Sequence, residues 1–245
     1  MNQKIKIGVF DSGIGGLWIL KHLRKRLSGF DYVFVGDRAN VPYGNKSLVE
    51  VKELSDRIVE FLIKKGCKLI VIACNTASTA ALNYLREKYK DINFVGMEPA
   101  IKPAVETTKT GKVGVLATSA TFQGELYNLV IEKFANGVEV FQDTCPGLVQ
   151  KIEENKIEES YEILEKALRP MMEKGIDKIV LGCTHYSYTI PIIKKITDIE
   201  IIDPTPAIVN RVESIVGKLE NKGSVELFSS GEFFIFEGVK SNVLE

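Results

Sequence analysis

Several absences narrow what this sequence of 245 residues can be. It has no apolar run of the roughly 20 residues that cross a membrane, and its start, MNQKIKIGVF, lacks the apolar core of a signal peptide. Lys plus Arg and Asp plus Glu number 32 each, so no broad basic field is available for nucleic acid. We expect a cytoplasmic protein that binds neither membranes nor nucleic acids.

Cysteine and histidine are scarce, with four and two copies, and their spacing argues against familiar metal and redox sites. No Cys-x-x-Cys pair exists, so a zinc ribbon or a thioredoxin-like site is not expected. His185 has no clear third and fourth partner for a metal. We therefore expect no metal, and four free thiols in a reducing compartment.

Two of these cysteines occupy matching places in the chain. Cys74 follows the apolar run 68–73, and Cys183 follows the apolar run 178–182. Such short runs are typical of buried strands, and each is followed by small polar residues. Ligands of open α/β sheets bind just outside the carboxyl ends of the strands. Both thiols are therefore expected where chemistry takes place.

A second landmark indicates an internal repeat. The run Lys6–Phe10 recurs as Lys112–Leu116, 106 residues later, and the two cysteines are 109 residues apart. The offsets agree within three residues, although apolar strands with glycine are common enough to match by chance. A repeat with one thiol in each half can place the thiols on opposite faces of one substrate.

Strand-like and helix-like segments alternate along the chain, which is typical of parallel sheets covered by helices. We predict an α/β fold with two pseudo-symmetric doubly wound domains and mainly parallel sheets. The expected strands are 5–11, 32–36, 68–74, 92–96, 112–117, 138–142, 178–183 and 200–202. The expected helices are 15–27, 47–65, 78–89, 121–135 and 189–197, with more than one helix over about 146–174.

Prolines mark two expected crossings between the domains. Residues 98–103 contain two prolines and are interpreted as a linker, and Asp203–Pro206 is interpreted as a second crossing. A helix over 207–221 and a Phe-rich strand over 225–236 have no counterpart in the second half, so we expect them to return to the first. The predicted domains are 1–97 plus 206–245, and 98–205, with the site in the cleft between them.

The segment Asp11–Gly16 follows a strand and opens a helix, where backbone N–H groups can hold an anion. A dinucleotide fingerprint would need glycine in place of Trp18, and no Gly-Lys-Ser/Thr follows for a phosphate-binding loop. A small carboxylate ligand fits better, unless the glycines only form a tight turn. Asp11 itself places a charge at the ligand edge of the sheet.

Three more residues are candidates on weaker grounds. Tyr43 lies in a Pro-Tyr-Gly turn and could offer its hydroxyl group to a ligand. His185, two residues after Cys183, could orient a thiol, accept a proton or neutralise a carboxylate. A Cys–His protease dyad would leave Cys74 unexplained. Glu153, on a predicted helix, would pass for a surface charge on its own.

Together these motifs resemble the aspartate/glutamate racemase superfamily, and its glutamate racemases most closely. Any one motif would be modest, but they run in order over about the first 205 residues. The matching runs are Phe10–Leu17, Val41–Gly44, Cys74–Ser78, Glu98–Pro103, Gly114–Thr118, Cys145–Val149 and Leu181–Tyr186.

The resemblance implies a homodimeric, cofactor-independent racemase that interconverts L- and D-glutamate, its small-molecule substrate, and supplies D-glutamate for peptidoglycan. It implies that Cys74 and Cys183 exchange protons, that Asp11 and His185 assist them, and that Glu153 is an acid with a lesser role. The substrate-binding residues that it implies are Asp11, Ser12, Pro42, Tyr43, Gly44, Asn75, Thr76, Thr118, Thr184 and His185.

The sequence departs from the family pattern at three positions. Trp18 lies where a small residue is common, Ser187 where proline is usual, and Pro204 where serine is frequent. None of these is a presumed proton carrier. Aspartate racemase and related decarboxylases are rival activities, but the decarboxylases keep only one catalytic cysteine. An amino-acid-binding module is the rival outside enzymes, although binding alone does not need paired thiols.

Overall fold

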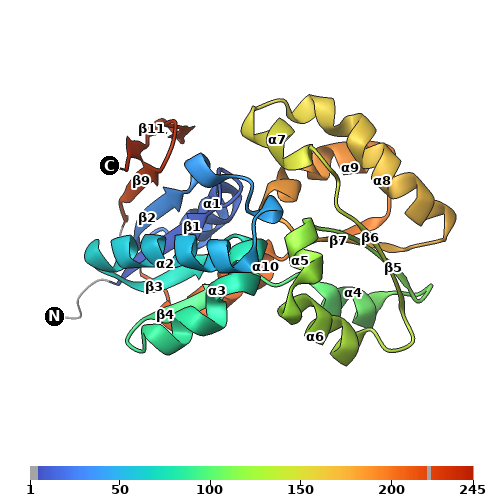
Figure 1. Ribbon diagram of the computed structural model, residues 1–245, viewed down its shortest axis with the longest axis horizontal. Coiled ribbons are helices and arrows are strands. Elements are labelled where there is room, and N and C mark those ends of the chain that lie inside the picture. The colour runs from blue at the N-terminus through green and yellow to red at the C-terminus, as the bar shows by residue number, and fades with distance from the viewer. Residues whose placement is uncertain (1–4, 220–221, 245) are drawn as a thin grey trace.

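The computed structural model describes residues 5–219 and 222–244 of the chain. It consists of two α/β units side by side, each with a parallel sheet flanked by helices (Figure 1). One sheet has six strands in the order β12-β9-β2-β1-β3-β4, and the other has four in the order β6-β5-β7-β8. The predicted fold class is confirmed.

The six-stranded sheet consists of β1 (Lys6–Asp11), β2 (Asp31–Gly36), β3 (Cys67–Ile72), β4 (Asn93–Gly96), β9 (Val225–Ser229) and β12 (Asn242–Val243). Its helices are α1 (Leu17–Arg26), α2 (Leu48–Lys64), α3 (Asn75–Lys88) and α10 (Thr205–Val216). Two short 3-10 helices, η1 (Arg38–Asn40) and η2 (Tyr43–Asn45), lie in the loop after β2.

The four-stranded sheet consists of β5 (Lys112–Leu116), β6 (Glu139–Asp143), β7 (Lys178–Leu181) and β8 (Glu200–Ile202). The accompanying helices are α4 (Ile101–Thr107), α5 (Ser119–Gln123), α6 (Glu125–Phe134), α7 (Leu148–Glu153), η3 (Ile157–Ser160), α8 (Tyr161–Glu173), η4 (Thr184–Thr189) and α9 (Ile190–Ile196). A separate antiparallel pair, β10 (Ile235–Phe236) and β11 (Val239–Lys240), follows β9.

The two sheets repeat one strand order, which makes the halves pseudo-symmetric. The order β2-β1-β3-β4 in one sheet corresponds to β6-β5-β7-β8 in the other. Register agrees as well, because Gly8 pairs with Ile70 and Gly114 pairs with Ile179. β3 and β7 are therefore equivalent strands, and the residues that follow them occupy equivalent places.

Helices bury both faces of the six-stranded sheet, which explains why its strands are almost wholly apolar. Ile7 and Val9 of β1 pack in one core with residues of α1 and α10. Phe10 packs in a second core with Ile58 of α2 and Leu85 of α3. The C-terminal segment returns to this sheet as expected, because β9 pairs in parallel with β2.

Some element predictions were wrong in detail. The segment interpreted as a linker contains the start of α4, and Pro103 is tolerated because the first turn needs no intrahelical N–H partner. The helix predicted over 121–135 is divided at Gly124, where a Cβ atom would lie 1.9 Å from Thr79 Cγ2. The end of the helix predicted over 207–221 lies partly outside the described residues.

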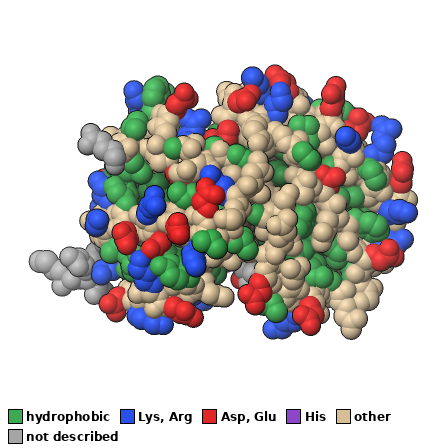
Figure 2. Space-filling model, viewed as in Figure 1, with side chains coloured by type: hydrophobic (Ala, Val, Ile, Leu, Met, Phe, Trp, Pro, Cys, Tyr) green, Lys and Arg blue, Asp and Glu red, His purple; other side chains and the backbone are tan. Residues whose placement is uncertain are grey.

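The described helices include none that is long and apolar enough to cross a membrane. Figure 2 shows charged side chains of both signs interspersed over the outer helices on the face drawn. The chain has a net charge of zero, and on this face the acidic and basic side chains are mixed rather than separated into opposed fields.

Candidate active site

Both thiols lie two residues beyond the ends of the equivalent strands β3 and β7. The Cys74 and Cys183 residues are only 5% and 8% exposed. They are close enough for negative charge on Cys183 to raise the pKa of Cys74. The fold thus brings together one thiol from each half, as the repeat in the sequence suggested.

Cys74 is the N-cap residue of α3, which begins at Asn75 and three residues earlier than predicted. Its Sγ atom accepts a hydrogen bond from Ala77 N at 3.4 Å and lies 3.8 Å from Ser12 Oγ. The helix N-terminus favours a thiolate here. Burial and the Asp11 carboxylate nevertheless raise the pKa of the Cys74 thiol well above its usual value, so in this conformation Cys74 is a neutral thiol.

Cys183 belongs to a buried chain of polar side chains. Its Sγ atom lies 3.9 Å from His185 Nδ1, and His185 Nε2 lies 2.6 Å from Glu153 Oε1. Burial alone would lower the pKa of His185, but hydrogen bonds to Cys183 and Glu153 and the charge of Asp11 raise it well above its ordinary value. A protonated imidazole therefore lies beside the Cys183 sulfur atom.

Glu153 is not the surface charge that its sequence context suggested. Its side chain is 8% exposed, at the end of α7. Burial would raise its pKa, but the hydrogen bond and charge of His185, the Ile14 N–H group and Arg38 outweigh burial and lower it. Glu153 is therefore an ionised carboxylate that pairs with the imidazolium.

Asp11, at the carboxyl end of β1, is completely buried and connects the two halves. One of its oxygens accepts a hydrogen bond from Gly13 N at 3.1 Å, and the other accepts one from Thr184 Oγ1 at 3.1 Å. Burial raises the pKa of Asp11, and the nearby positive charge of His185 opposes that rise. Asp11 therefore lies between the two thiol arms.

The glycine loop after β1 holds an anion, but that anion belongs to the protein. Ile14 N donates a hydrogen bond to Glu153 Oε1 at 2.7 Å. A Cβ atom at Gly13 would lie 1.9 Å from the same oxygen, and one at Gly15 would lie 2.5 Å from His185 Nδ1. The glycines therefore let the loop contact side chains of the other half, and the Ile14 N–H group is not free to bind a ligand carboxylate in this conformation.

Asn75 is the one predicted binding residue whose polar atoms are buried and unsatisfied. It is 2% exposed, and neither Nδ2 nor Oδ1 has a hydrogen-bond partner among the described residues. Leaving a buried polar group unpaired costs about 1–3 kcal/mol. Next to it, Thr76 Oγ1 lies 2.9 Å from Thr118 Oγ1, across the boundary between the halves. A polar ligand at Asn75 would supply the missing partners.

The Pro-Tyr-Gly turn is held by a residue that the sequence analysis did not identify. The Tyr43 hydroxyl group donates a hydrogen bond to Asp37 Oδ2 at 2.5 Å, and Asp37 also accepts hydrogen bonds from Asn40 and Ser230. A Cβ atom at Gly44 would lie 2.8 Å from Thr118 Cβ. Tyr43 is thus anchored inside the protein, and Gly44 permits close approach to the second half.

Comparison with known proteins bears on what this site is for. Residues 19–212 match the family described as Asp/Glu/Hydantoin racemase, which is most of the chain. This chain belongs to that family. The family membership predicted from the sequence motifs is confirmed.

Relatives of this racemase include the glutamate racemase of Pseudomonas paraeruginosa, 42% identical over 218 residues, which are 87% of this chain and 82% of the relative. The crystal structure of Escherichia coli glutamate racemase in complex with L-glutamate and the activator UDP-MurNAc-ala has a TM-score of 0.84 at 31% identity, covering 96% of this chain and 91% of that one. The crystal structure of Francisella tularensis glutamate racemase in complex with D-glutamate has a TM-score of 0.81 at 32% identity, covering 94% of this chain and 89% of that one. The chain is therefore an isomerase of the glutamate racemase type.

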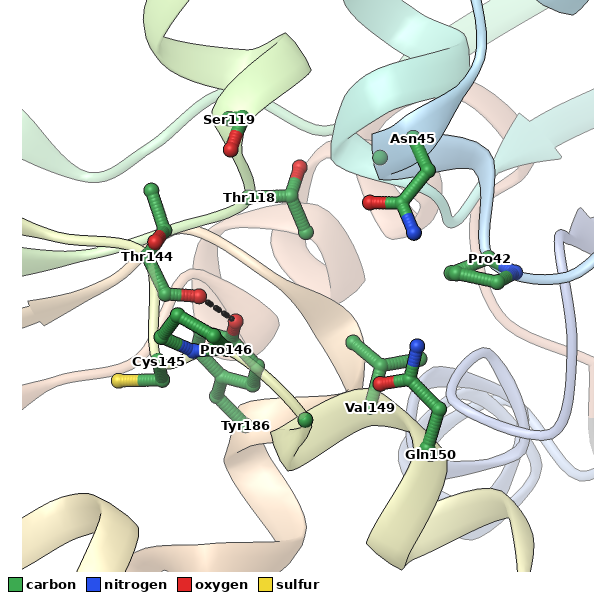
Figure 3. A pocket seen from close by; sticks show the side chains of 12 residues that line it. Pro42, Asn45, Thr118, Ser119, Thr144, Cys145, Pro146, Val149, Gln150 and Tyr186 are labelled. Carbon is green, nitrogen blue, oxygen red and sulfur yellow. Dashed lines mark hydrogen bonds between the residues drawn. The ribbon is translucent and has the colours of Figure 1, made fainter.

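A cavity of about 180 Å³ is lined by residues from both halves of this racemase (Figure 3). Pro42, Gly44 and Thr118 line it as predicted binding residues. The other lining residues were not predicted to bind the substrate; they are Asn45, Ser119, Thr144, Cys145, Pro146, Gly147, Val149, Gln150 and Tyr186. Neither Cys74 nor Cys183 is among the lining residues, so the two thiols do not face this cavity.

The Cys145 side of the cavity is built from the turn before α7. Tyr186 donates a hydrogen bond to Thr144 O at 2.8 Å, drawn in Figure 3. Cys145 is buried, and its φ of 43° is unusual for a residue other than glycine. The described residues include no group of three or more His, Cys, Asp or Glu side chains suited to a metal ion.

Two of the departures from the family pattern meet at one acidic residue. Trp18 Nε1 donates to Asp203 Oδ2 at 3.3 Å, and Ser187 Oγ donates to Asp203 Oδ1 at 3.3 Å. Pro204 follows Asp203 directly and precedes α10. The departures therefore lie at a crossing between the halves, and the hydrogen-bond partners of the two sulfur atoms in the described structure are other residues.

Proposed function

We propose that this racemase interconverts L- and D-glutamate by moving the α-proton between Cys74 and Cys183 without a cofactor. The observation that carries the proposal is one buried thiol from each half, placed after equivalent strands and near enough for their charges to interact. The choice of glutamate is supported by relatives that are glutamate racemases and by related structures with either enantiomer of glutamate bound.

In the proposed reaction, one cysteine is a thiolate and the other is a thiol. The thiolate takes the α-proton, and the electron pair of the broken C–H bond remains on the substrate as an enolate-like carbanion. The opposite thiol then gives its proton to the other face of that carbon and becomes the thiolate. The roles of the two sulfur atoms are therefore exchanged after each turnover, and the enantiomer bound decides which thiol acts first.

The charges beside the two sulfur atoms support a mechanism in which one cysteine is the thiolate while the other is the thiol. The imidazolium of His185 would stabilise negative charge that develops on Cys183. Among the described residues, no cation is found that favours the Cys74 thiolate, and Asp11 disfavours it. The ammonium group of a bound amino acid would offset the Asp11 charge and so lower the pKa of Cys74. Cys74 would thus become able to form a thiolate only when the substrate is bound.

The other predicted residues are proposed to hold the substrate. Asn75, with its unpaired amide group, is the strongest of these candidates, and Thr76, Thr118 and Thr184 lie around the boundary between the halves. One good donor to a developing oxyanion lowers the barrier by about 3–4 kcal/mol. The remaining proposed contacts are Ser12, Pro42, Tyr43 and Gly44.

Further inferences rest on the resemblance to glutamate racemases. We infer that the enzyme is a cytoplasmic homodimer whose D-glutamate supplies peptidoglycan synthesis. The domain limits proposed are 1–97 plus 206–245, and 98–205. Closure of these domains around the substrate would exclude water and fix the distance between each thiol and the α-carbon.

Incubation with L-glutamate in D2O, without added pyridoxal phosphate or metal, tests the proposed reaction directly. We expect optical rotation to fall to zero while deuterium enters the α-position of the newly formed D-glutamate. Exchange with aspartate but not with glutamate would keep the two-thiol chemistry and change the substrate. Saturable glutamate binding without any α-exchange would contradict the proposal and favour a binding module.

Replacing Asn75 by Ala separates binding from folding. Because the Asn75 amide group has no partner among the described residues, its loss should leave the melting temperature unchanged or slightly higher. The kcat/KM for glutamate should fall roughly 10- to 100-fold, the equivalent of the hydrogen bonds lost. Asn128→Ala, on the exposed face of α6, is the matched control and should change neither quantity. An unaltered kcat/KM in Asn75→Ala would remove Asn75 from the proposed site.

A further inference from the structure

Arg38 joins three segments that are far apart in the sequence. Its side chain is 19% exposed, and the residue begins η1, in the loop after β2. Arg38 Nε donates to Glu153 Oε2 at 3.2 Å, on the opposite half. One terminal nitrogen, Nη1, donates to the carbonyl oxygens of Glu232 and Phe233 at 3.2 and 3.3 Å. The C-terminal turn after β9 therefore fixes the guanidinium group from behind.

The two oxygens of Glu153 have separate partners. Oε1 accepts from Ile14 N and contacts His185 Nε2, at 2.7 and 2.6 Å. Oε2 has Arg38 as its hydrogen-bond partner. The torsion that turns a glutamate carboxylate is broad and weakly restrained by itself. Pinning Oε2 therefore keeps Oε1 directed at the imidazole.

We propose that Arg38 is a positioning residue of the Cys183 arm, and that the C-terminal turn at 232–233 holds Arg38 in place. Through Glu153, Arg38 sets the orientation and the protonation of His185, which in turn lies beside the Cys183 sulfur atom. Its effect on catalysis rests on the proposed function. Neither Arg38 nor residues 232–233 were candidates in the sequence analysis.

The ion pair is not an ordinary surface contact. Exposed pairs contribute little because water screens them and two long side chains lose freedom. Here the carboxylate is 8% exposed, and the two carbonyl groups already restrain the guanidinium group. Its planar fork can hold both sets of acceptors at once, which a lysine ammonium group on a flexible stem does less well.

In the part of the chain that the structure describes, the titratable or charged side chains that act on Glu153 include Arg38, His185, Asp11 and Tyr188. Arg38 and His185 favour the ionised carboxylate, whereas Asp11 and a deprotonated Tyr188 would oppose it. Burial raises the pKa of Glu153 and the charge of Arg38 lowers it, so the pKa of Glu153 should rise when Arg38 is removed. Protonated Glu153 no longer accepts the hydrogen bond of the imidazolium. As the pH falls, activity that needs this contact is therefore lost at a higher pH than in the unaltered enzyme.

Replacing Arg38 by Met in the full chain tests the proposal. We expect kcat for glutamate racemisation to fall about tenfold, with KM nearly unchanged because Arg38 does not line the cavity. The acidic limb of the kcat profile should move to higher pH. Arg38→Lys keeps the charge and should recover part of kcat, which also covers the case in which Arg38→Met does not fold.

Arg24→Met is the matched control. Arg24 also pairs with the C-terminal segment, through Glu237, and its side chain is similarly exposed at 24%, but it has no contact with Glu153. This variant should keep kcat and the pH profile of the unaltered enzyme. Equal losses in Arg24→Met and Arg38→Met would overturn the proposal, because they would trace the effect to the attachment of the C-terminal segment alone.

Imidazole titration by NMR gives a readout that does not depend on activity. The chain has two histidines, so a His22→Gln variant assigns the His185 signals. If Arg38 positions Glu153, its loss weakens the Glu153–His185 hydrogen bond and lowers the pKa of His185. Removing only a distant positive charge would instead raise that pKa, and this result or no change would contradict the proposal. Failure of the unaltered enzyme to racemise glutamate would count against the proposed function and leave this titration as a separate test of Arg38.

Discussion

Cys74→Ala is expected to lower kcat for glutamate racemisation roughly 10⁴-fold, which leaves almost no measurable turnover. The Cys74 thiol is one of the two groups that must face opposite sides of the α-carbon. Among the described residues, the only other side chain with an acidic or basic group that is hydrogen-bonded to this sulfur atom is Ser12, through its hydroxyl group. Alanine keeps a small side chain at the N-cap position of α3 and removes only the sulfur atom and the hydrogen bond that it accepts from Ala77 N.

The Cys74→Ala enzyme should retain one half of the reaction. In D2O, Cys183 can still remove and return the α-proton of the enantiomer for which it is the base, so that enantiomer exchanges its α-hydrogen without inverting. Cys183→Ala should exchange the other enantiomer instead. This opposite selectivity, measured by the α-proton signals of the separate enantiomers, would be hard to produce by general damage to the fold.

Cys67→Ala is the control for both thiol variants. Cys67 begins β3 and is 1% exposed in the apolar core, where its Sγ atom would lie 3.3 Å from a Cβ atom at Gly8. Its loss should cost about 1 kcal/mol of stability through a small cavity, and kcat should not change. Unimpaired racemisation by Cys74→Ala would contradict the two-thiol mechanism.

The placement of the two thiols was predictable because it depends on local pattern and chain continuity. Strands with both faces covered are continuous apolar runs, and the residues after parallel strands meet at one edge of a sheet. The repeat in the sequence then implied that Cys74 and Cys183 belong to equivalent positions, which the matching strand orders confirm. No contact between the halves had to be known for this step.

The partners of those thiols were less accessible, because they depend on how the halves pack. Glu153 is 139 residues from Ile14 and 115 from Arg38, and its helical position alone indicates solvent. The family resemblance named Glu153 but not the partner that orients it. Likewise, the glycines at 13 and 15 looked like a ligand loop, since nothing local reveals that side chains of another segment fill the space a Cβ atom would take.

Gly15→Ala is expected to lower kcat about 100-fold, because misplacing a catalytic group by about 1 Å can have that effect. The new Cβ atom would lie 2.5 Å from His185 Nδ1 and 2.8 Å from Cε1, so the imidazole or the loop must move. His185 is 2% exposed and is held between Cys183 and Glu153, so it cannot move without weakening one of these contacts. Measuring kcat together with the melting temperature separates a displaced His185 ring, which lowers kcat, from a general loss of stability, which lowers the melting temperature.

The backbone at Gly15 is not in the left-handed region, so an alanine there is disfavoured by the contact and not by its φ angle. Gly137 gives the converse case, with a φ of 79° and no atom within 4 Å of an added Cβ. Gly137→Ala should lose about 1 kcal/mol of stability and keep its kcat. If Gly15→Ala loses stability to the same extent but also keeps its kcat, the position of the His185 ring does not control the reaction, and the role proposed for the imidazolium beside Cys183 must be abandoned.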